Sequence, residues 1–250
     1  IADNRRLFQP LIESAYKYGI SINDLKLSAA CAANNLKLRT HPRILVDVSY
    51  ISNMDAGTGI QRVVNNIVKE FLNLAEPSIH FELIKIENGK LYQAYRYAER
   101  LFKLPVDCLG KENQVDIKAG DYLFMLDSSW HLIDQFADVF DSIRQNGGRI
   151  FTQLYDLIPI RYPESTDVNM PLVFKKWIRT AIDQSDEVIC ISRSVADELA
   201  RYIEEENISL KHDLDLAFVH LGSDIKVASA RDDPIGDQVK LMLSSDTGPI

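Results

Sequence analysis

A glycine-rich segment stands directly before a strong helical pattern, and its residue types suit anion binding. It contains Gly57, Thr58 and Gly59, and apolar residues recur at helical spacing from Ile60 onward. Glycines let backbone N–H groups approach an anion, and the N-terminus of a helix adds partial positive charge. The alternative is that the glycines only make a sharp turn between a strand and a helix.

The spacing of these glycines argues against a dinucleotide-binding loop. The fingerprint Gly-x-Gly-x-x-Gly requires a third glycine where this chain has Arg62, and the loop is too long for the tight turn. An NAD-type Rossmann oxidoreductase is therefore kept only as an alternative enzyme class.

A second loop combines acidic, hydroxyl and aromatic side chains. Asp127, Ser128, Ser129 and Trp130 follow an apolar segment. An indole can stack on a sugar ring while the polar groups bind its hydroxyls. The alternative is that Ser129 caps the following helix and Trp130 packs on the sheet.

Two more loops place polar residues after apolar segments. Tyr155 and Asp156 precede two prolines, which predicts a rigidly placed carboxylate, or else a turn in which Asp156 bonds to nearby backbone. Ser192 and Arg193 open a helical pattern, where an N-cap role for Ser192 is favoured over catalysis. Cys190 lies inside an apolar segment and is expected to be an inert core thiol.

These loops are positioned by alternating apolar strands and amphipathic helices. The pattern predicts an α/β fold with a Rossmann-like parallel sheet and helices on both faces. Because ligands of such sheets bind beyond the carboxyl ends of the strands, the four loops should lie at one edge. The expected strands are residues 44–48, 79–86, 90–95 (joined to the previous one by an Asn88-Gly89 turn), 121–126, 149–155, 187–191 and 216–221; the expected helices cover 60–72, 133–143, 172–182 and 194–206, the last opened by a capping box at Ser194.

Composition excludes several classes of protein. The 250 residues carry 28 Lys and Arg against 36 Asp and Glu, a net charge of −8, so nucleic-acid binding is not expected. No apolar run approaches the ~20 residues of a membrane span. The three cysteines are widely spaced and the histidines lack metal-ligand spacing, so we expect a cytoplasmic protein without a metal site.

The ordered set of segments resembles the N-terminal domain of a family 4 retaining glycosyltransferase of GT-B fold, of the bacterial surface-polysaccharide type. The segments that carry the resemblance are residues 44–49, 55–63, 121–127, 155–159, 162–164, 181–199 and 219–224. It implies three zones: a helical N-terminal extension and linker (1–42), a Rossmann-like glycosyltransferase domain (43–224), and a connector toward a missing C-terminal domain (225–250). Since the sequence opens at Ile1 rather than Met, we expect a piece of a longer protein.

By this resemblance the chain is the acceptor-side half of an enzyme that transfers a sugar, with retention, to a growing surface polysaccharide. The co-substrate is a nucleotide sugar, with GDP-mannose suggested only by the resemblance, and no cofactor or metal is required. The partners implied are the nucleotide-sugar-binding C-terminal domain of the same chain and a saccharide or lipid-linked acceptor. The full-length enzyme would associate peripherally with the inner face of the membrane, and this isolated half would be inactive.

The resemblance also assigns roles to residues. Asp156 and Tyr155 would contact the transferred sugar, although many relatives have His-Asp there and tyrosine cannot serve as a near-neutral base. The loop 57–59 would face the donor, with Gln61 and Arg62 lining the cleft. Asp127 and Trp130 would orient the acceptor, and Ser192 and Arg193 would border it. A non-catalytic binding or assembly module is the remaining alternative.

Overall fold

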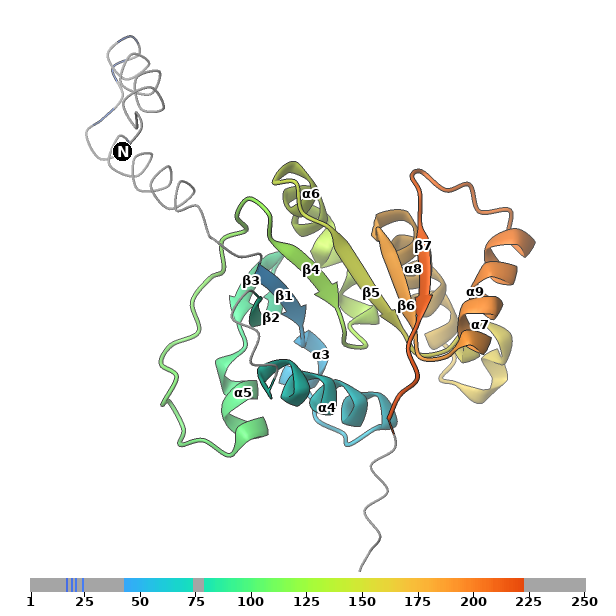
Figure 1. The fold of residues 1–250 in the computed structure, drawn as a ribbon, viewed down its shortest axis with the longest axis horizontal. Helices are drawn as coiled ribbons and strands as arrows, with labels where there is room; N and C mark the ends of the chain where they lie inside the picture. The colour runs from blue at the N-terminus through green and yellow to red at the C-terminus, as the bar shows by residue number, and fades with distance from the viewer. Residues whose placement is uncertain are drawn as a thin grey trace, which may run out of the picture. The chain divides into compact units, whose positions relative to one another are not determined.

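The computed structural model describes residues 43–73 and 79–222, together with Lys17, Gly19, Ser21 and Asp24. Within these ranges the chain forms one seven-stranded sheet with the strand order β3-β2-β1-β4-β5-β6-β7 (Figure 1). The expected helical extension over 1–42 and the connector over 225–250 fall outside the described residues, apart from those four positions.

The sheet is parallel except for β3, which pairs with β2 in the antiparallel sense. This confirms the predicted α/β, Rossmann-like sheet. The strands are β1 (Arg43–Asp47), β2 (His80–Glu87), β3 (Lys90–Gln93), β4 (Tyr122–Met125), β5 (Ile150–Leu154), β6 (Glu187–Cys190) and β7 (Asp215–Phe218).

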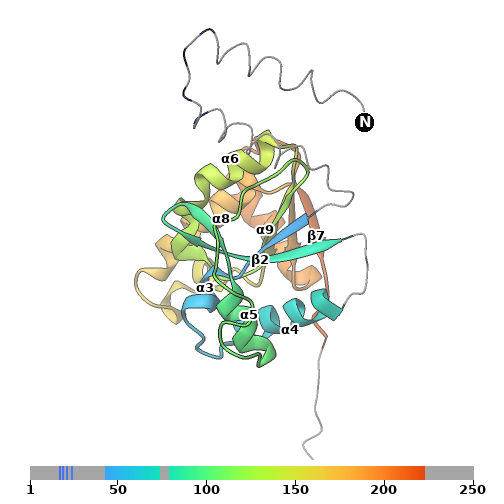
Figure 2. The same cartoon turned by 90° about the vertical axis from the view of Figure 1, so that its left-hand side faces the viewer.

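Helices cover both faces of the sheet (Figure 2), because successive apolar side chains of a strand point to opposite faces and both faces must be buried. On β1, Leu45 packs into one core and Val46 into the other. The first core is covered by η1 (Trp130–Phe136), α6 (Ala137–Gln145), α8 (Met170–Gln184) and α9 (Arg193–Glu205), and the second by α3 (Ser49–Asn53), α4 (Gly59–Asn73) and α5 (Tyr95–Phe102); α7 (Ile158–Arg161) and η2 (Pro163–Ser165) precede α8.

The strand order reverses direction between β1 and β4. From β1 the chain continues to β2 on one side, and it later returns to place β4 on the other. Such a switch point leaves a crevice at the carboxyl ends of the two strands, which is where ligands bind in open α/β sheets. At the amino ends of the same strands, Arg43 links neighbouring segments. Its Nε donates to Asp121 at 3.0 Å, and its Nη1 pairs with Glu82 at 2.5 Å.

The backbone confirms the predicted Asn88-Gly89 turn and shows a second glycine turn after α6. Asn88 and Gly89 both have positive φ (51° and 76°), as a two-residue hairpin turn between β2 and β3 requires. Gly147 follows α6 with φ +71°, and a Cβ on Gly148 would lie 2.0 Å from the carbonyl oxygen of Asp121. The glycine pair therefore ends α6 and lets the chain pass close to the start of β4.

Three boundaries differ from expectation. The loop expected after β1 contains the one-turn helix α3, and the strand expected over 90–95 ends at Gln93, after which α5 begins. The capping box predicted at Ser194 is wrong, because α9 begins at Arg193 and its cap is Ser192. In the first two cases a short polar or aromatic segment lacks the long periodicity that identifies a helix. In the third, Ser192 and Ser194 are both suitable cap residues, and the structure uses the former.

Candidate functional site

The loop before α4 is folded by its own side chains. Thr58 and Gln61 form a reciprocal capping box: Thr58 Oγ1 accepts from the Gln61 amide at 3.3 Å, and Gln61 Oε1 accepts from the Thr58 amide at 3.2 Å. Gln61 Oε1 also accepts from the amide of Ala56 at 2.8 Å, and its Nε2 donates to the Met54 carbonyl at 2.5 Å. Gln61 is fully buried, so it holds the loop together and does not line an open surface.

The capping box leaves few loop amides free for a ligand. Besides Ala56 and Thr58, the Gly57 amide donates to Asp55 Oδ1 at 3.1 Å, in a backbone of φ +63°. The amides of Gly59 and Ile60 begin α4, where a helix has no internal acceptor for them. These two amides are therefore the donors that the start of α4 leaves without an acceptor inside the helix.

Arg62 stands in the first turn of α4 next to those amides. Its side chain is exposed, and within residues 43–73 and 79–222 its guanidinium makes no recorded hydrogen bond or ion pair. A guanidinium in this setting can form paired, charge-assisted hydrogen bonds to a phosphate or carboxylate.

Asp127 is buried beneath α3. It is 2% exposed, and Oδ2 accepts from the Ile51 amide at 2.6 Å while Oδ1 accepts from the Ser128 amide at 2.7 Å. Burial raises the pKa of Asp127, and its hydrogen bonds to the backbone amides of Ile51, Ser128 and Tyr50 oppose that shift. Its carboxylate therefore caps a helix, and does not reach a substrate directly.

A second buried carboxylate, which the sequence analysis missed, lies beside Asp127. Asp47 is the last residue of β1 and is fully buried. Its Oδ1 accepts from the amide and hydroxyl of Ser49, the former at 3.0 Å, and Oδ2 accepts from the hydroxyl of Ser129 at 2.7 Å. Burial, followed by the charge of Asp127, raises the pKa of Asp47 to about 7, while the hydrogen bonds of Ser49 and Ser129 oppose the rise. An ionisable residue inside an apolar strand was the available signal.

Ser129 and Trp130 fit neither the sugar-binding interpretation nor the capping-and-packing interpretation alone. The hydroxyl of Ser129 binds Asp47 and makes no capping bond to η1. Trp130 is half-buried and stands edge-on to Phe174, with ring centroids 5.0 Å apart. Its ring is thus fixed by the core while part of its surface stays open.

An open hollow of about 620 Å³ brings Trp130 together with Asp156. Asp156 is half-buried, and its Oδ1 accepts from the Ile158 amide at 3.0 Å, which confirms the turn interaction. The hollow lies where the loops after β4 and β5 meet the start of α8, and its lining is Trp130, Asp156, Ile158, Pro159, Glu164, Ser165, Thr166, Asp167 and Met170. Three carboxylates, two hydroxyls and an indole make it acidic, polar and partly aromatic.

Tyr155 occupies the core next to that hollow. It is 5% exposed, and its hydroxyl donates to the Leu126 carbonyl at 2.8 Å. Burial raises the pKa of Tyr155, so the phenol stays protonated. This arrangement makes Tyr155 a link between the ends of β4 and β5 and gives it no open face toward a sugar.

Ser192 and Cys190 behave as the simpler interpretations predict. The Ser192 hydroxyl accepts from the Val195 amide at 3.3 Å and so caps α9. Burial raises the pKa of the fully buried Cys190 thiol to about 12, which makes it inert. Arg193 is exposed beside Asp197, with their charged atoms 3.9 Å apart.

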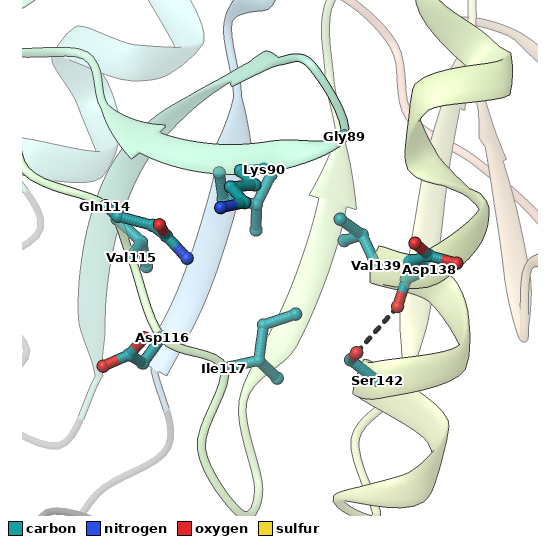
Figure 3. Close-up of a pocket in the computed structure, with 10 residues that line it drawn as sticks. Gly89, Lys90, Gln114, Val115, Asp116, Ile117, Asp138, Val139 and Ser142 are labelled. Carbon is teal, nitrogen blue, oxygen red and sulfur yellow. Dashed lines mark hydrogen bonds between the residues drawn. The ribbon is translucent and has the colours of Figure 1, made fainter. Parts of the chain in front are cut away.

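A separate hollow of about 350 Å³ lies at the β3 edge of the sheet (Figure 3). Lys90, Gln114, Asp116 and Asp138 surround an aliphatic floor, and Ser142 donates to the backbone carbonyl of Asp138. None of the predicted site residues lines it. Among the described residues, no group of three or more His, Cys, Asp or Glu side chains is arranged to hold a metal ion, and no helix is both long and apolar enough to cross a membrane.

Comparison with known proteins gives similarity to one kind of enzyme. No protein-family profile matches the chain. Over 228 residues, 90% of this chain, it is 28% identical to a serotype-specific mannosyltransferase, WbdA, of Escherichia coli, of which the matched region is 27%. Two further Escherichia coli proteins of that name match with the same identity over 26% and 27% of their lengths. The chain thus spans about a quarter of the length of the curated relatives to which it is similar.

Proposed function

We propose that this chain is the acceptor-side domain of a glycosyltransferase that adds hexose units, with retention, to a growing O-antigen or other surface polysaccharide. The proposal is supported by the similarity to serotype-specific mannosyltransferases over 90% of the chain. The observation that carries it is the hollow in which Trp130 and Asp156 meet, where the loops after β4 and β5 reach the start of α8. GDP-mannose is the proposed donor, held mainly by a nucleotide-sugar-binding C-terminal domain of the full-length protein.

The acidic hollow is the proposed acceptor subsite. The open part of the Trp130 indole can stack on the apolar face of a pyranose, and carboxylates accept hydrogen bonds from sugar hydroxyls. Asp156, Glu164 and Asp167 contribute negative charge to the hollow. Like charges repel across such a short range, so the subsite favours an uncharged saccharide over a phosphate-bearing group. The acceptor is a saccharide, free or lipid-linked, presented at the cytoplasmic face of the membrane.

The start of α4 is the proposed donor-facing element. The amides of Gly59 and Ile60, together with the exposed guanidinium of Arg62, suit the diphosphate of a nucleotide sugar. The capping box of Thr58 and the buried Gln61 holds those amides in place.

In the proposed reaction, an acceptor hydroxyl oxygen bonds to the anomeric carbon of the donor sugar as the bond from that carbon to the diphosphate oxygen breaks. The electron pair leaves with the nucleoside diphosphate, and the acceptor proton passes to a departing phosphate oxygen. This route requires no metal and no basic side chain from this half. Asp156 orients the acceptor, and Tyr155 acts through the position of the loop after β5.

The test is transfer of mannose from GDP-mannose to a mannose oligosaccharide by the full-length enzyme. We expect Asp156→Ala and Trp130→Ala each to raise the KM for the acceptor at least tenfold while the KM for the donor changes little. Asp138→Ala, at the separate hollow beside β3, is the matched control and should match the wild type. Unchanged acceptor KM in both site variants would refute the subsite, and wild-type activity of Gly59→Val would refute the donor-facing role of α4.

A further inference from the structure

The buried carboxylates Asp47 and Asp127 hold α3 from two different strands. Asp47 ends β1 and binds the amide and hydroxyl of Ser49, the first residue of the helix. Asp127 follows β4 and binds the amide of Ile51 at 2.6 Å. Every residue that hydrogen-bonds to these two carboxylates is at most 7% exposed, except Tyr50, which is half-buried. A five-residue helix has little stability of its own, so these bonds determine where it lies.

The same pair connects the two loops that carry the proposed substrate contacts. The loop 54–58 leaves from the end of α3, and the Ser129 hydroxyl, which binds Asp47 Oδ2 at 2.7 Å, immediately precedes Trp130. Ser49 extends the network to the sheet, since its Oγ accepts from the Ile86 amide on β2 at 2.8 Å. Displacing either carboxylate would therefore disturb the donor-facing and acceptor-facing loops together.

We propose that Asp47 and Asp127 are positioning residues that fix α3 and the two adjoining loops. The pair holds a single proton, which Asp47 carries while Asp127 is ionised. The link to substrate rests on the proposed function, whereas the anchoring of α3 does not.

The hydrogen-bond pattern assigns the proton to Asp47. Both oxygens of Asp127 accept from backbone amides, which cannot reverse their role. On Asp47, Oδ2 faces only the Ser129 hydroxyl, which can accept as well as donate. A protonated Oδ2 can thus donate to Ser129 while Oδ1 keeps its bonds to Ser49. Two carboxylates buried together favour such a neutral and ionised pair over two charges.

The two tyrosines that face the pair stay in one state near neutral pH. Tyr97 on α5 and Tyr155 after β5 both face Asp127, and burial raises the pKa of each, so they remain neutral. Asp55 and Arg100 act on Tyr97 with opposite signs. The proton on Asp47 is therefore the one whose loss near neutral pH changes the charge of the network.

The asymmetry between the two carboxylates gives a sharp test. Asp47→Asn can keep Oδ1 on Ser49 and turn its NH₂ toward the Ser129 hydroxyl, which mimics the protonated acid. Asp127→Asn places an NH₂ against a backbone amide in either orientation: against Ile51, α3 loses a bond, and against Ser128, the side chain that holds α3 loses the bond that orients it. Asp121→Asn is the matched control, because Asp121 is also buried but pairs with Arg43 at the opposite ends of β1 and β4.

The experiment is hydrogen–deuterium exchange of peptides covering residues 48–58 in the full-length protein, corrected for intrinsic exchange. If one proton is released when α3 detaches, the equilibrium constant for this opening should rise by up to about tenfold between pH 6 and pH 8 in the wild type. Asp47→Asn should abolish that rise, Asp127→Asn should speed exchange at every pH, and Asp121→Asn should keep the wild-type profile. Ser129→Ala, which removes a bond to ionised Asp47, should shift the rise to higher pH.

Two results would overturn the proposal. A wild-type profile that is flat from pH 6 to pH 8, or one that Asp47→Asn leaves unchanged, would remove the shared proton. Normal exchange in Asp127→Asn would remove the anchor. Mannose transfer by the same variants tests the positioning role separately. Faster α3 exchange with an unchanged kcat/KM would overturn the positioning of the site, while the anchoring of α3 would stand. This result does not depend on the outcome for the acceptor subsite.

Discussion

The phenolic oxygen of Tyr155 lies 2.8 Å from the carbonyl oxygen of Leu126, to which it donates a hydrogen bond. The bond joins the ends of β5 and β4, the two strands whose loops meet at the acidic hollow. A residue that the sequence places next to Asp156 as a sugar contact thus acts on the backbone that carries Trp130.

Replacing Tyr155 tests this linking role. Tyr155→Phe leaves the buried Leu126 carbonyl without its donor, so the free energy of unfolding should fall by about 1 kcal/mol. Because the phenol does not ionise near neutral pH, the pH profile of mannose transfer should keep its shape. Urea denaturation and initial rates across pH 6–9 measure both. A hundredfold loss of kcat without any loss of stability would instead give Tyr155 a direct role in catalysis.

Gln61 should prove more important to the loop than its neighbours. Gln61→Ala removes the acceptor of the Ala56 and Thr58 amides and the donor to Met54, and we expect a loss of about 2 kcal/mol. Gln61→Glu keeps the acceptor and should cost less. Limited proteolysis of residues 54–58, together with urea denaturation, provides the measurement. Equal stability of Gln61→Ala and the wild type would contradict a capping role.

Stability should depend on pH through Asp47. Its pKa of about 7 in the folded state is above the ordinary value of 3.8 for an aspartate, so the folded state binds the proton more tightly. The resulting stabilisation is fully present below about pH 4 and is lost as pH rises through 7. The loss is at most about 4 kcal/mol by linkage. Asp47→Asn should therefore lose less stability than the wild type between pH 4 and pH 8 in urea denaturation, and parallel curves would contradict the assignment.

The glycines after α6 should differ in their tolerance of a methyl group. Gly148→Ala places a Cβ 2.0 Å from the Asp121 carbonyl oxygen, which requires backbone movement and should cost about 3 kcal/mol. Gly147→Ala meets no atom within 4 Å but must adopt φ +71°, and should cost about 1 kcal/mol. Thermal unfolding of the two variants gives the order, and a more stable Gly148→Ala would refute the contact.

The sheet could be predicted because its signals are long or specific. Apolar strands alternating with amphipathic helices fit only a few topologies, and Asn88-Gly89 is compatible with few turns. The helices α3 and α5 could not be found in this way. Their stability comes from Asp47 and Asp127 in the first case, and in the second from packing of Tyr97 against the sheet, neither of which is a local pattern.

The candidate site was predicted in location more than in detail. The rule for strand ends led to the loops carrying Trp130 and Asp156, and the structure shows that these two residues line one hollow. It could not tell that Gln61 and Asp127 point inward, because a polar residue after a strand serves equally well as a cap or as a ligand contact. The Thr-x-x-Gln spacing at 58–61 was a readable sign of the capping box.

The pairing of β1 with β4 has a consequence for synthesis of the chain. Arg43 and Asp121, which hydrogen-bond across these strands, are 78 positions apart, and β2, β3, α4 and α5 lie between them. On the ribosome β1 therefore emerges with one edge unpaired, and it stays so until β4 follows. During that interval an open apolar edge is available to other nascent chains, so this domain should depend on chaperones early in translation more than its final compactness would suggest.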